Sequence, residues 1–259
     1  MENNKKPKKA LTVDQQIKRR NFISFGVFGV MSAAAYTGWQ KLYHSPKEVA
    51  GITANEHAPL RRALNKTELF FRNFFSSNHL VKTYPKEMAA KNVRQNSNIG
   101  LKTPVDLPGW SLFVKKQNGE VFNITMDQIR ALPKTEIVFD FKCVEGWDQI
   151  QHWGGLKFID FIDHFGLANE TTAGYVGMMT PDKQYFVGLD MPSAVHPQTI
   201  LAYEMNGKPI PVNHGAPLRL IIPVKYGIKN LKRIGSITFS NKRPPDYWAH
   251  AGYDYYSGL

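Results

Sequence analysis

The chain has 259 residues, 42% of them apolar and 12% aromatic, which supports a packed core and excludes disorder for most of its length. Its formal net charge of +12 favours anionic ligands or membrane surfaces, but no basic run outside the N-terminal tail is typical of a nucleic-acid-binding stripe, so we expect no nucleic acid partner. The single cysteine, Cys143, excludes an internal disulfide.

The N-terminus is predicted to be a basic cytoplasmic tail, residues 1–20, followed by an apolar stretch, residues 21–40. The stretch NFISFGVFGVMSAAAYTGWQ contains no charged residue. Twenty helical residues span about 30 Å, which is the hydrocarbon thickness of a bilayer. The small residues of SAAAY (32–36) offer a cleavage site, so the stretch is either a removed signal or a retained anchor, and we favour the anchor.

Paired arginines precede this stretch in KRRNFI, residues 18–23. The pattern resembles the twin-arginine export signal, which carries folded proteins across bacterial membranes. An ordinary signal anchor that contains two arginines is the alternative. Export after folding suits a protein whose cofactor is inserted in the cytoplasm, and it predicts a location on the periplasmic side of the inner membrane.

Residues 41–105 are predicted to be a lead-in and covering segment, with a helix over 59–75 and extended chain over 76–100. From about residue 106 to 259 the pattern changes to strands and turns, which predicts a mixed α+β domain with a β-rich body. The expected elements are a hairpin over 110–126, a short helix over 126–133, a strand over 135–144, a helix over 156–167, a hairpin over 201–213, and buried strands over 218–224 and 235–239.

Cys143 ends the predicted strand TEIVFDFKCV, on the same face as Ile137, Phe139 and Phe141. A buried cysteine can be a spectator, a nucleophile or a metal ligand. The polar and bulky residues that follow it, from Glu145 to Asp148, suit the rim of a pocket. Because HExxH, CxxC and CxxCH are all missing from the sequence, a metal bound here would take most of its ligands from a cofactor. A protease pairing of Cys143 with His152 has no supporting signature.

A basic run follows in NHGAPLRLIIPVKYGIKNLKRIG, residues 213–235. It is either a solvated face or a cradle in which lysine and arginine neutralise a phosphate. Neither the Walker A pattern nor GxGxxG is present, so a nucleotide fold of either type is not expected. The basic residues of the run are His214, Arg219, Lys225, Lys229, Lys232 and Arg233.

Five motifs occur in a fixed order: CVEGW, LAYEMNG, HGAPLRLIIP, YGIKNLK and PPDYW…GY. Together they resemble the oxidoreductase molybdopterin-binding domain of the sulfite oxidase superfamily, over roughly residues 60–255. The closer likeness is to exported bacterial members, which include methionine sulfoxide reductases. The resemblance implies that Cys143 binds molybdenum, whose other ligands are the dithiolene sulfurs of molybdopterin and terminal oxygens. It further implies pterin contacts from Thr180, His214, Arg219, Asn230, Leu231 and Lys232.

Two departures from the reductase pattern are visible. His214 stands where the reductases have asparagine and sulfite oxidases have histidine. An early asparagine-containing segment has no clear match, and its nearest candidates are Thr67-Glu68 and Asn73.

The resemblance implies an enzyme that moves one oxygen atom and two electrons to or from a small sulfur- or nitrogen-containing substrate. Because the sequence has no haem or iron–sulfur motif, we expect a membrane haem protein or a soluble cytochrome as electron partner. Sulfite oxidation remains open as a second activity, and a tethered binding module without turnover remains open as a different class.

Overall fold

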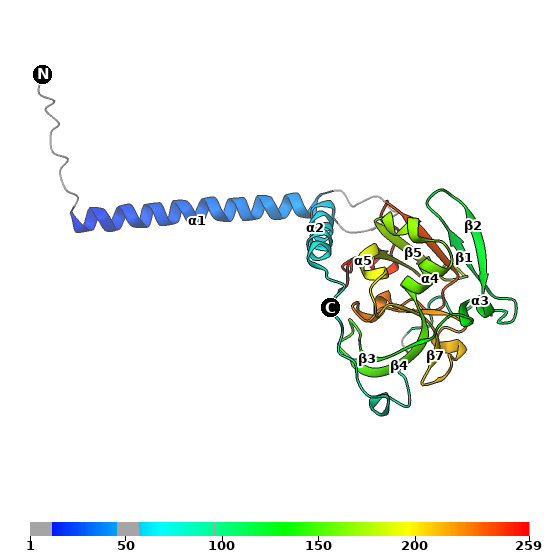
Figure 1. Cartoon of the computed structure of the whole chain (residues 1–259). Helices are drawn as coiled ribbons and strands as arrows, with labels where there is room; N and C mark the ends of the chain where they lie inside the picture. Colours follow the sequence, from blue (N-terminus) through cyan, green and yellow to red (C-terminus); the bar gives the residue numbers. More distant parts are fainter. Residues whose placement is uncertain (1–11, 46–56, 96, 259) are drawn as a thin grey trace, which may run out of the picture. The chain divides into compact units, whose positions relative to one another are not determined.

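The computed structural model describes residues 12–45, 57–95 and 97–258. The chain divides into two compact units. The first is Met1–Pro46 with His57–Pro59, and the second is Lys47–Glu56 with Leu60–Leu259. Figure 1 shows the elements of both.

The first unit consists mainly of the helix α1, Val13–Tyr43. A capping box begins it: the Thr12 hydroxyl accepts from the Gln15 N–H, and the Gln15 side chain accepts from the Thr12 N–H. The helix covers the predicted apolar stretch 21–40 and extends through the basic end of the tail, because lysine and arginine are good helix formers. It is long and apolar enough to cross a membrane, a property that a signal sequence shares.

The second unit contains two five-stranded sheets in the part of the chain that the structure describes. The first sheet has the order β2-β1-β10-β5-β6, with β1 and β10 parallel and the other neighbours antiparallel. The second has the order β3-β4-β7-β8, and β9 also pairs with β7. The strands of the first sheet are β1 Ser111–Lys115, β2 Val121–Thr125, β5 Tyr175–Met179, β6 Phe186–Asp190 and β10 Ser236–Ser240. Those of the second are β3 Thr135–Lys142, β4 Asp148–Lys157, β7 Ile200–Met205, β8 Lys208–Pro209 and β9 Arg219–Ile221.

Short helices connect the strands, and one longer helix precedes them. The α-helices are α2 Ala58–Phe74, α3 Met126–Arg130, α4 Phe158–His164, α5 Met191–Ala194 and α6 Tyr247–His250. The 3₁₀ turns are η1 Lys86–Met88, η2 Ala168–Thr172, η3 Val212–His214 and η4 Gly227–Lys229.

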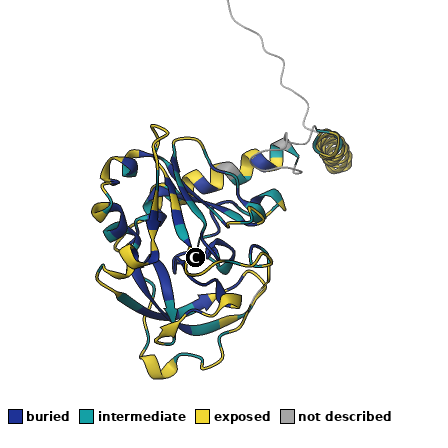
Figure 2. Ribbon diagram, turned by 90° about the vertical axis from the view of Figure 1, so that its right-hand side faces the viewer, coloured by how far each residue is buried: buried dark blue, intermediate teal, exposed yellow. Residues whose placement is uncertain are grey.

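The core lies on both sides of the second sheet. Figure 2 colours the buried residues dark blue. Leu156 and Leu201 of this sheet pack in one cluster with α4 and with the inner face of the first sheet. Ile137, Phe139 and Phe141 of β3 pack on the other side in a second cluster. Since side chains alternate along a strand, this burial confirms the predicted face of residues 135–144.

The mixed α+β architecture and both hairpins are confirmed, whereas several element boundaries were wrong; the short helix predicted over 126–133, for example, ends at Arg130. The helix predicted over 156–167 begins at Phe158, because Leu156 and Lys157 complete β4 opposite Leu201 and Ile200. The strand predicted over 218–224 is limited to β9. Sequence patterning did not find β4, β5 or β6; β4 is buried on both faces from Gln151 to Leu156 and therefore has no polar–apolar alternation.

Two lysines of the basic run are fully buried and paired with carboxylates. Lys225 lies 3.1 Å from Asp190, and Lys229 lies 2.5 Å from Asp246. Asp190 also caps α5 by accepting from the Ser193 N–H and hydroxyl. Burial alone would raise the pKa of Asp190, but Lys225 and Ser193 outweigh it and hold the pKa below its ordinary value. Lys225 thus ties the segment before η4 to the end of β6, and Lys229 of η4 also donates to the Gly188 carbonyl of β6.

We predict that Asp190→Asn lowers the free energy of unfolding by about 3–5 kcal/mol, because it leaves the Lys225 ammonium buried beside a neutral group. Urea denaturation monitored by circular dichroism measures the change. Glu120→Gln, which breaks the exposed pair with Lys116, is the matched control and should leave stability unchanged. Equal stability of the two variants would contradict the structural role of the buried pair.

Candidate active site

Cys143 is held at the end of β3 by a tight turn into β4. The Gly146 N–H donates to the Cys143 carbonyl at 3.1 Å, and the Cys143 N–H donates to the Trp147 carbonyl at 2.9 Å. Gly146 has a φ of +83°, in the left-handed region that favours glycine. The turn therefore fixes the backbone of Cys143 and leaves its side chain on the buried face of the strand.

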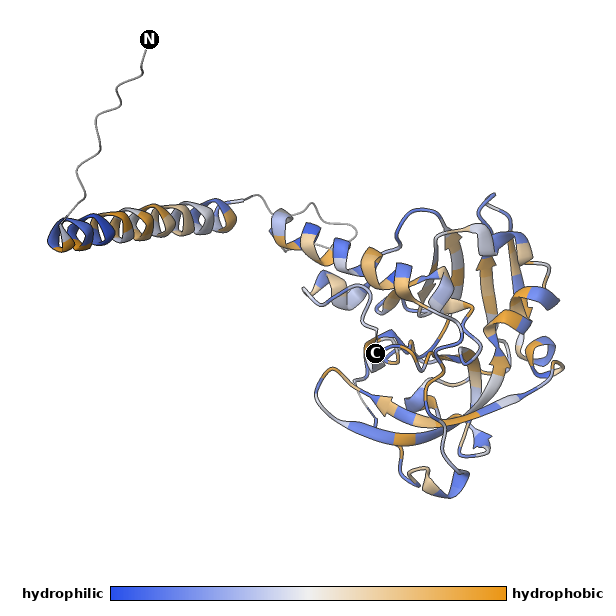
Figure 3. Cartoon of the chain, turned by 60° about the vertical axis from the view of Figure 1, so that its left-hand side comes forward, coloured by the Kyte–Doolittle hydropathy of each residue, from blue (hydrophilic) through white to orange (hydrophobic). Residues whose placement is uncertain are grey.

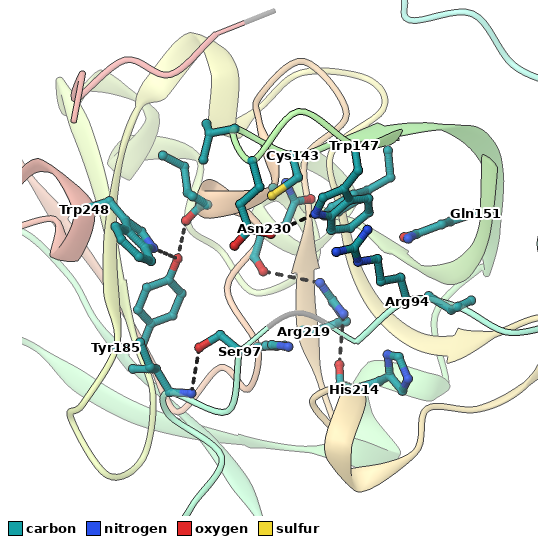
Figure 4. A pocket seen from close by; sticks show the side chains of 18 of the residues that line it. Arg94, Ser97, Cys143, Trp147, Gln151, Tyr185, His214, Arg219, Asn230 and Trp248 are labelled. Atoms are coloured by element: carbon teal, nitrogen blue, oxygen red, sulfur yellow. Dashed lines mark hydrogen bonds between the residues drawn. The ribbon is translucent and has the colours of Figure 1, made fainter. Parts of the chain in front are cut away.

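The Cys143 side chain lines a pocket of about 910 Å³, part of which is open to solvent. Figure 4 shows the sulfur pointing into the space between Trp147, Asn230 and Arg219. Trp147 stacks on Phe141, with ring centroids 6.0 Å apart, and its indole N–H donates to Glu145. Of the predicted rim residues, Glu145 and Trp147 thus line the pocket, and Gly146 and Asp148 do not.

Basic side chains from the run 213–235 form the opposite wall. His214, Arg219 and Lys232 line the pocket. Gly215 has a φ of +105°, and a Cβ there would lie 2.7 Å from the Cβ of Lys232, so only glycine lets the His214 loop pack against Lys232. The Arg219 guanidinium donates to the carbonyls of His214 and Asn230, which ties the loop to η4.

Burial dominates the electrostatics of this wall. It lowers the pKa of His214 to about 4, with smaller contributions from Arg219 and Lys232. Burial, and then Arg219, lowers the pKa of Lys232 to about 7, and burial lowers that of Arg219 to about 9. Among the described lining residues the one carboxylate is Glu145. An anion in the pocket would raise these pKa values and offset the cost of burying positive charge.

The donor set fits an anionic cofactor that brings its own metal ligands. No group of three or more histidine, cysteine, aspartate or glutamate side chains in the described residues could hold a metal ion. A single thiol is a suitable soft ligand for a metal whose other ligands come from an organic carrier. The basic wall would neutralise the phosphate of such a carrier.

The structure brings four predicted pterin-contact residues to the pocket that Cys143 lines: His214, Arg219, Asn230 and Lys232. Asn230 is oriented by the Ile222 N–H, which donates to its side-chain oxygen, and by the Tyr226 carbonyl, which accepts from its amide.

Thr180 and Leu231 lie outside the lining of this pocket. Leu231 is fully buried in the larger core cluster. The Thr180 hydroxyl bonds to Asp182 and to the backbone of Tyr185. Their contacts with a pterin stay predictions.

The remaining candidates take other positions. Glu68 is buried and paired with Arg243, while Thr67 and Asn73 are exposed, and none of the three lines the pocket. The phosphate cradle predicted from the whole basic run is smaller than expected, because Lys225 and Lys229 pair with carboxylates and Arg233 donates to the Ala216 carbonyl. His152 lies near Glu136 and does not line the pocket.

Sequence reasoning missed several lining residues. Tyr185 donates to the Ile228 carbonyl at 2.5 Å and accepts from the Trp248 indole N–H, and burial raises its pKa. Arg94 places its guanidinium 4.6 Å from the centre of the Trp147 ring. Arg94 belongs to the covering segment, whose backbone pairs with β4 through the Ala90 N–H and the Ile150 carbonyl. No local pattern marks these residues, because they reach the pocket only through contacts distant in sequence.

Residues 100–248 match the family of the oxidoreductase molybdopterin binding domain. The match covers more than half of the chain, so the chain belongs to this family and is a molybdopterin oxidoreductase of the sulfite oxidase superfamily.

Similar proteins include reductases of oxidised methionine. The chain is 33% identical over 186 residues to an Azospira oryzae protein provisionally named as the protein-methionine-sulfoxide reductase subunit YedZ1, covering 71% of this chain and 70% of the relative. It is 33% identical to the catalytic subunit MsrP of Xanthomonas campestris, over 55% of this chain and 48% of the relative. It is 26% identical to MsrP of Campylobacter jejuni, over 93% of this chain and 80% of the relative. It thus spans about half the length of the Xanthomonas relative. The crystal structure of the sulfane dehydrogenase SoxCD of Paracoccus pantotrophus aligns with 54% of this chain and 40% of its own chain, with 14% sequence identity and a TM-score of 0.49.

A test of the basic wall follows from the pKa of Lys232. Because its folded-state pKa of about 7 is below the ordinary 10.5, protonated Lys232 penalises the cofactor-free folded state fully below pH 7, and the penalty falls as pH rises toward 10.5. We predict that Lys232→Met stabilises the cofactor-free protein at pH 6, by at most about 5 kcal/mol, and by much less at pH 9.5.

Urea denaturation at the two pH values measures this difference, and exposed Lys208→Met is the control that should show none. In the loaded protein the same Lys232 variant should weaken cofactor retention. A variant that is equally destabilising at both pH values would show that Lys232 serves the fold alone.

Proposed function

We propose that this chain is a membrane-tethered, exported molybdoenzyme that reduces methionine sulfoxide, with Cys143 as the protein ligand of molybdenum. The observation that carries the proposal is that the one thiol lines the same pocket as the basic wall of His214, Arg219 and Lys232, of which the first two are buried and the third is half-buried. The family supplies the cofactor class, and the names of the relatives favour a sulfoxide as substrate.

The roles of the side chains follow from their positions. The Cys143 thiolate would hold the metal, and Arg219 and Lys232 would bind the anionic part of the cofactor. His214 would stay neutral at pH 7, since its pKa is about 4, and could accept or donate one hydrogen bond. The bound molybdenum supplies the two-electron redox change and the transfer of oxygen.

The open part of the pocket favours a thioether-like substrate. The pocket is lined by Val93, Val144, Trp147 and Tyr253, which are all partly exposed. An incoming side chain would therefore meet apolar and aromatic surface. Sulfite, a compact dianion, would gain little from that surface.

The N-terminal helix supports anchoring and export. The helix α1 has the length and hydropathy of a membrane span, and Arg19 and Arg20 lie near its N-terminal end. With the basic side in the cytoplasm, the second unit would lie on the periplasmic side. Electrons would come from a membrane haem protein or a cytochrome.

We predict that Cys143→Ser keeps the fold but loses activity by more than about 100-fold and molybdenum retention by at least about tenfold, because a hydroxyl is a poorer ligand than a thiolate for this metal. Elemental analysis, pterin fluorescence and circular dichroism measure metal, cofactor and fold. Lys142→Ser changes the adjacent residue, which is exposed and outside the lining of this pocket, and should behave as the native chain. Normal molybdenum in an active Cys143→Ser protein would remove the assigned role.

We further predict that the loaded chain oxidises a reduced dye with methionine sulfoxide at least about tenfold faster than it reduces an oxidised dye with sulfite. Steady-state assays on one preparation compare the rate of methionine sulfoxide reduction with the rate of sulfite oxidation. Faster turnover with sulfite would favour the sulfite oxidase alternative, and full molybdenum occupancy without turnover of either compound would favour a binding module.

A further inference from the structure

The helix α2 has an inverted distribution of charge and apolar surface. Its two fully buried side chains among the described ones are Arg61 and Glu68, whereas Leu69, Phe70 and Phe74 are exposed. Phe70 and Phe74 are 57% and 72% exposed, and their ring centroids lie 4.8 Å apart. A helix on the surface of a soluble domain normally turns its apolar stripe inward.

Specific contacts fix the inward side of α2. The Arg61 guanidinium donates to the Ala249 carbonyl at 2.8 Å, and Glu68 forms an ion pair with Arg243. Arg72 lies 5.0 Å from the centre of the Tyr175 ring. These contacts lock the rotation of the helix about its axis, so the outward position of the phenylalanines is set by the fold.

The outward side combines aromatic and positive groups. At 100° per residue, Ala63, Phe70 and Phe74 fall on one stripe, and Arg62 and Lys66 fall beside it, both exposed. The one carboxylate of α2, Glu68, is turned inward. Figure 2 shows exposed and buried residues alternating along this helix, and Figure 3 shows hydrophobic residues along it.

We propose that the outward face of α2 binds the surface of an anionic lipid bilayer, with Phe70 and Phe74 inserted at the level of the headgroups and Arg62 and Lys66 beside anionic lipid. Aromatic rings and long basic side chains are the residues that favour this interface. The proposal rests on the membrane anchoring proposed above. The fourteen residues 44–57 separate α1 from α2, and at about 3.3–3.6 Å per residue they keep α2 within about 50 Å of the end of a membrane-crossing α1.

Such a contact would orient the second unit on the bilayer. Attachment through α1 alone would not define the direction that the pocket faces, whereas a second attachment at α2 would restrict it. The pocket would then be presented at a defined height and angle to a membrane-bound electron donor.

The test uses the full chain with a protease recognition site placed between residues 46 and 56. The protein is reconstituted into phosphatidylcholine vesicles containing about one quarter phosphatidylglycerol, and the site is then cut. The fraction of the released second unit that sediments with the vesicles is compared for the native chain and for a Phe70→Ser, Phe74→Ser variant. A Phe113→Ser, Val121→Ser variant removes exposed apolar surface from the first sheet and is the matched control.

We expect the native and control units to stay with the vesicles and the α2 variant to be released, with a partition coefficient lower by about tenfold or more. Vesicles of phosphatidylcholine alone should hold the native unit roughly tenfold less well. Release of the native unit as complete as that of the α2 variant would overturn the proposal, as would equal retention of both.

Size-exclusion chromatography of the second unit, after it is cut from α1 and in the absence of vesicles, provides a further check. A dimer that is lost in the α2 variant would show that a second copy covers this face and would overturn lipid binding. Molybdenum content and sulfoxide reduction, measured on the same samples, test the proposed enzyme separately, because neither depends on vesicle retention.

Discussion

Arg219 and Lys232 line the same pocket as the only thiol of the chain, and the burial that lowers the pKa of both basic groups costs free energy unless negative charge compensates it. The glycine at position 215 lets the His214 loop pack against Lys232, and the turn at Gly146 fixes the cysteine. The two loops therefore place the basic side chains and the Cys143 thiol around one pocket, which an anionic, metal-bearing cofactor could fill. The family match names such a cofactor, molybdopterin.

The same basic run illustrates how a fold separates structural from functional charge. Lys225 and Lys229 are paired with Asp190 and Asp246, and Lys229 also donates to the Gly188 carbonyl of β6. Lys232, three residues after Lys229, faces the pocket instead. Lys229 ends η4, whereas Lys232 follows that turn and forms a β-bridge with Arg219 of β9, so lysines three residues apart have different surroundings.

The second unit also carries an outward aromatic face on α2, and the ion pair of Glu68 with Arg243 explains how this unusual orientation is maintained. Buried charges stabilise a helix in one rotation only when their partners are in place. The cost of exposing Phe70 and Phe74 to water is then recovered if the helix meets a lipid surface.

The sequence by itself determined the α+β class, the alternating face of β3, both hairpins and the long apolar helix, because each depends on residues close together in the chain. Five ordered motifs also predicted Cys143 and the basic loop as parts of one site. Tertiary structure alone decided which basic residues reach the pocket, since Lys225 and Lys232 differ only in the distant partners that the sheets bring to them. It likewise decided the places of Arg94 and Tyr185 in the lining and the outward rotation of α2. No periodic pattern encodes such contacts, because their energies arise between segments that meet only after the chain has folded.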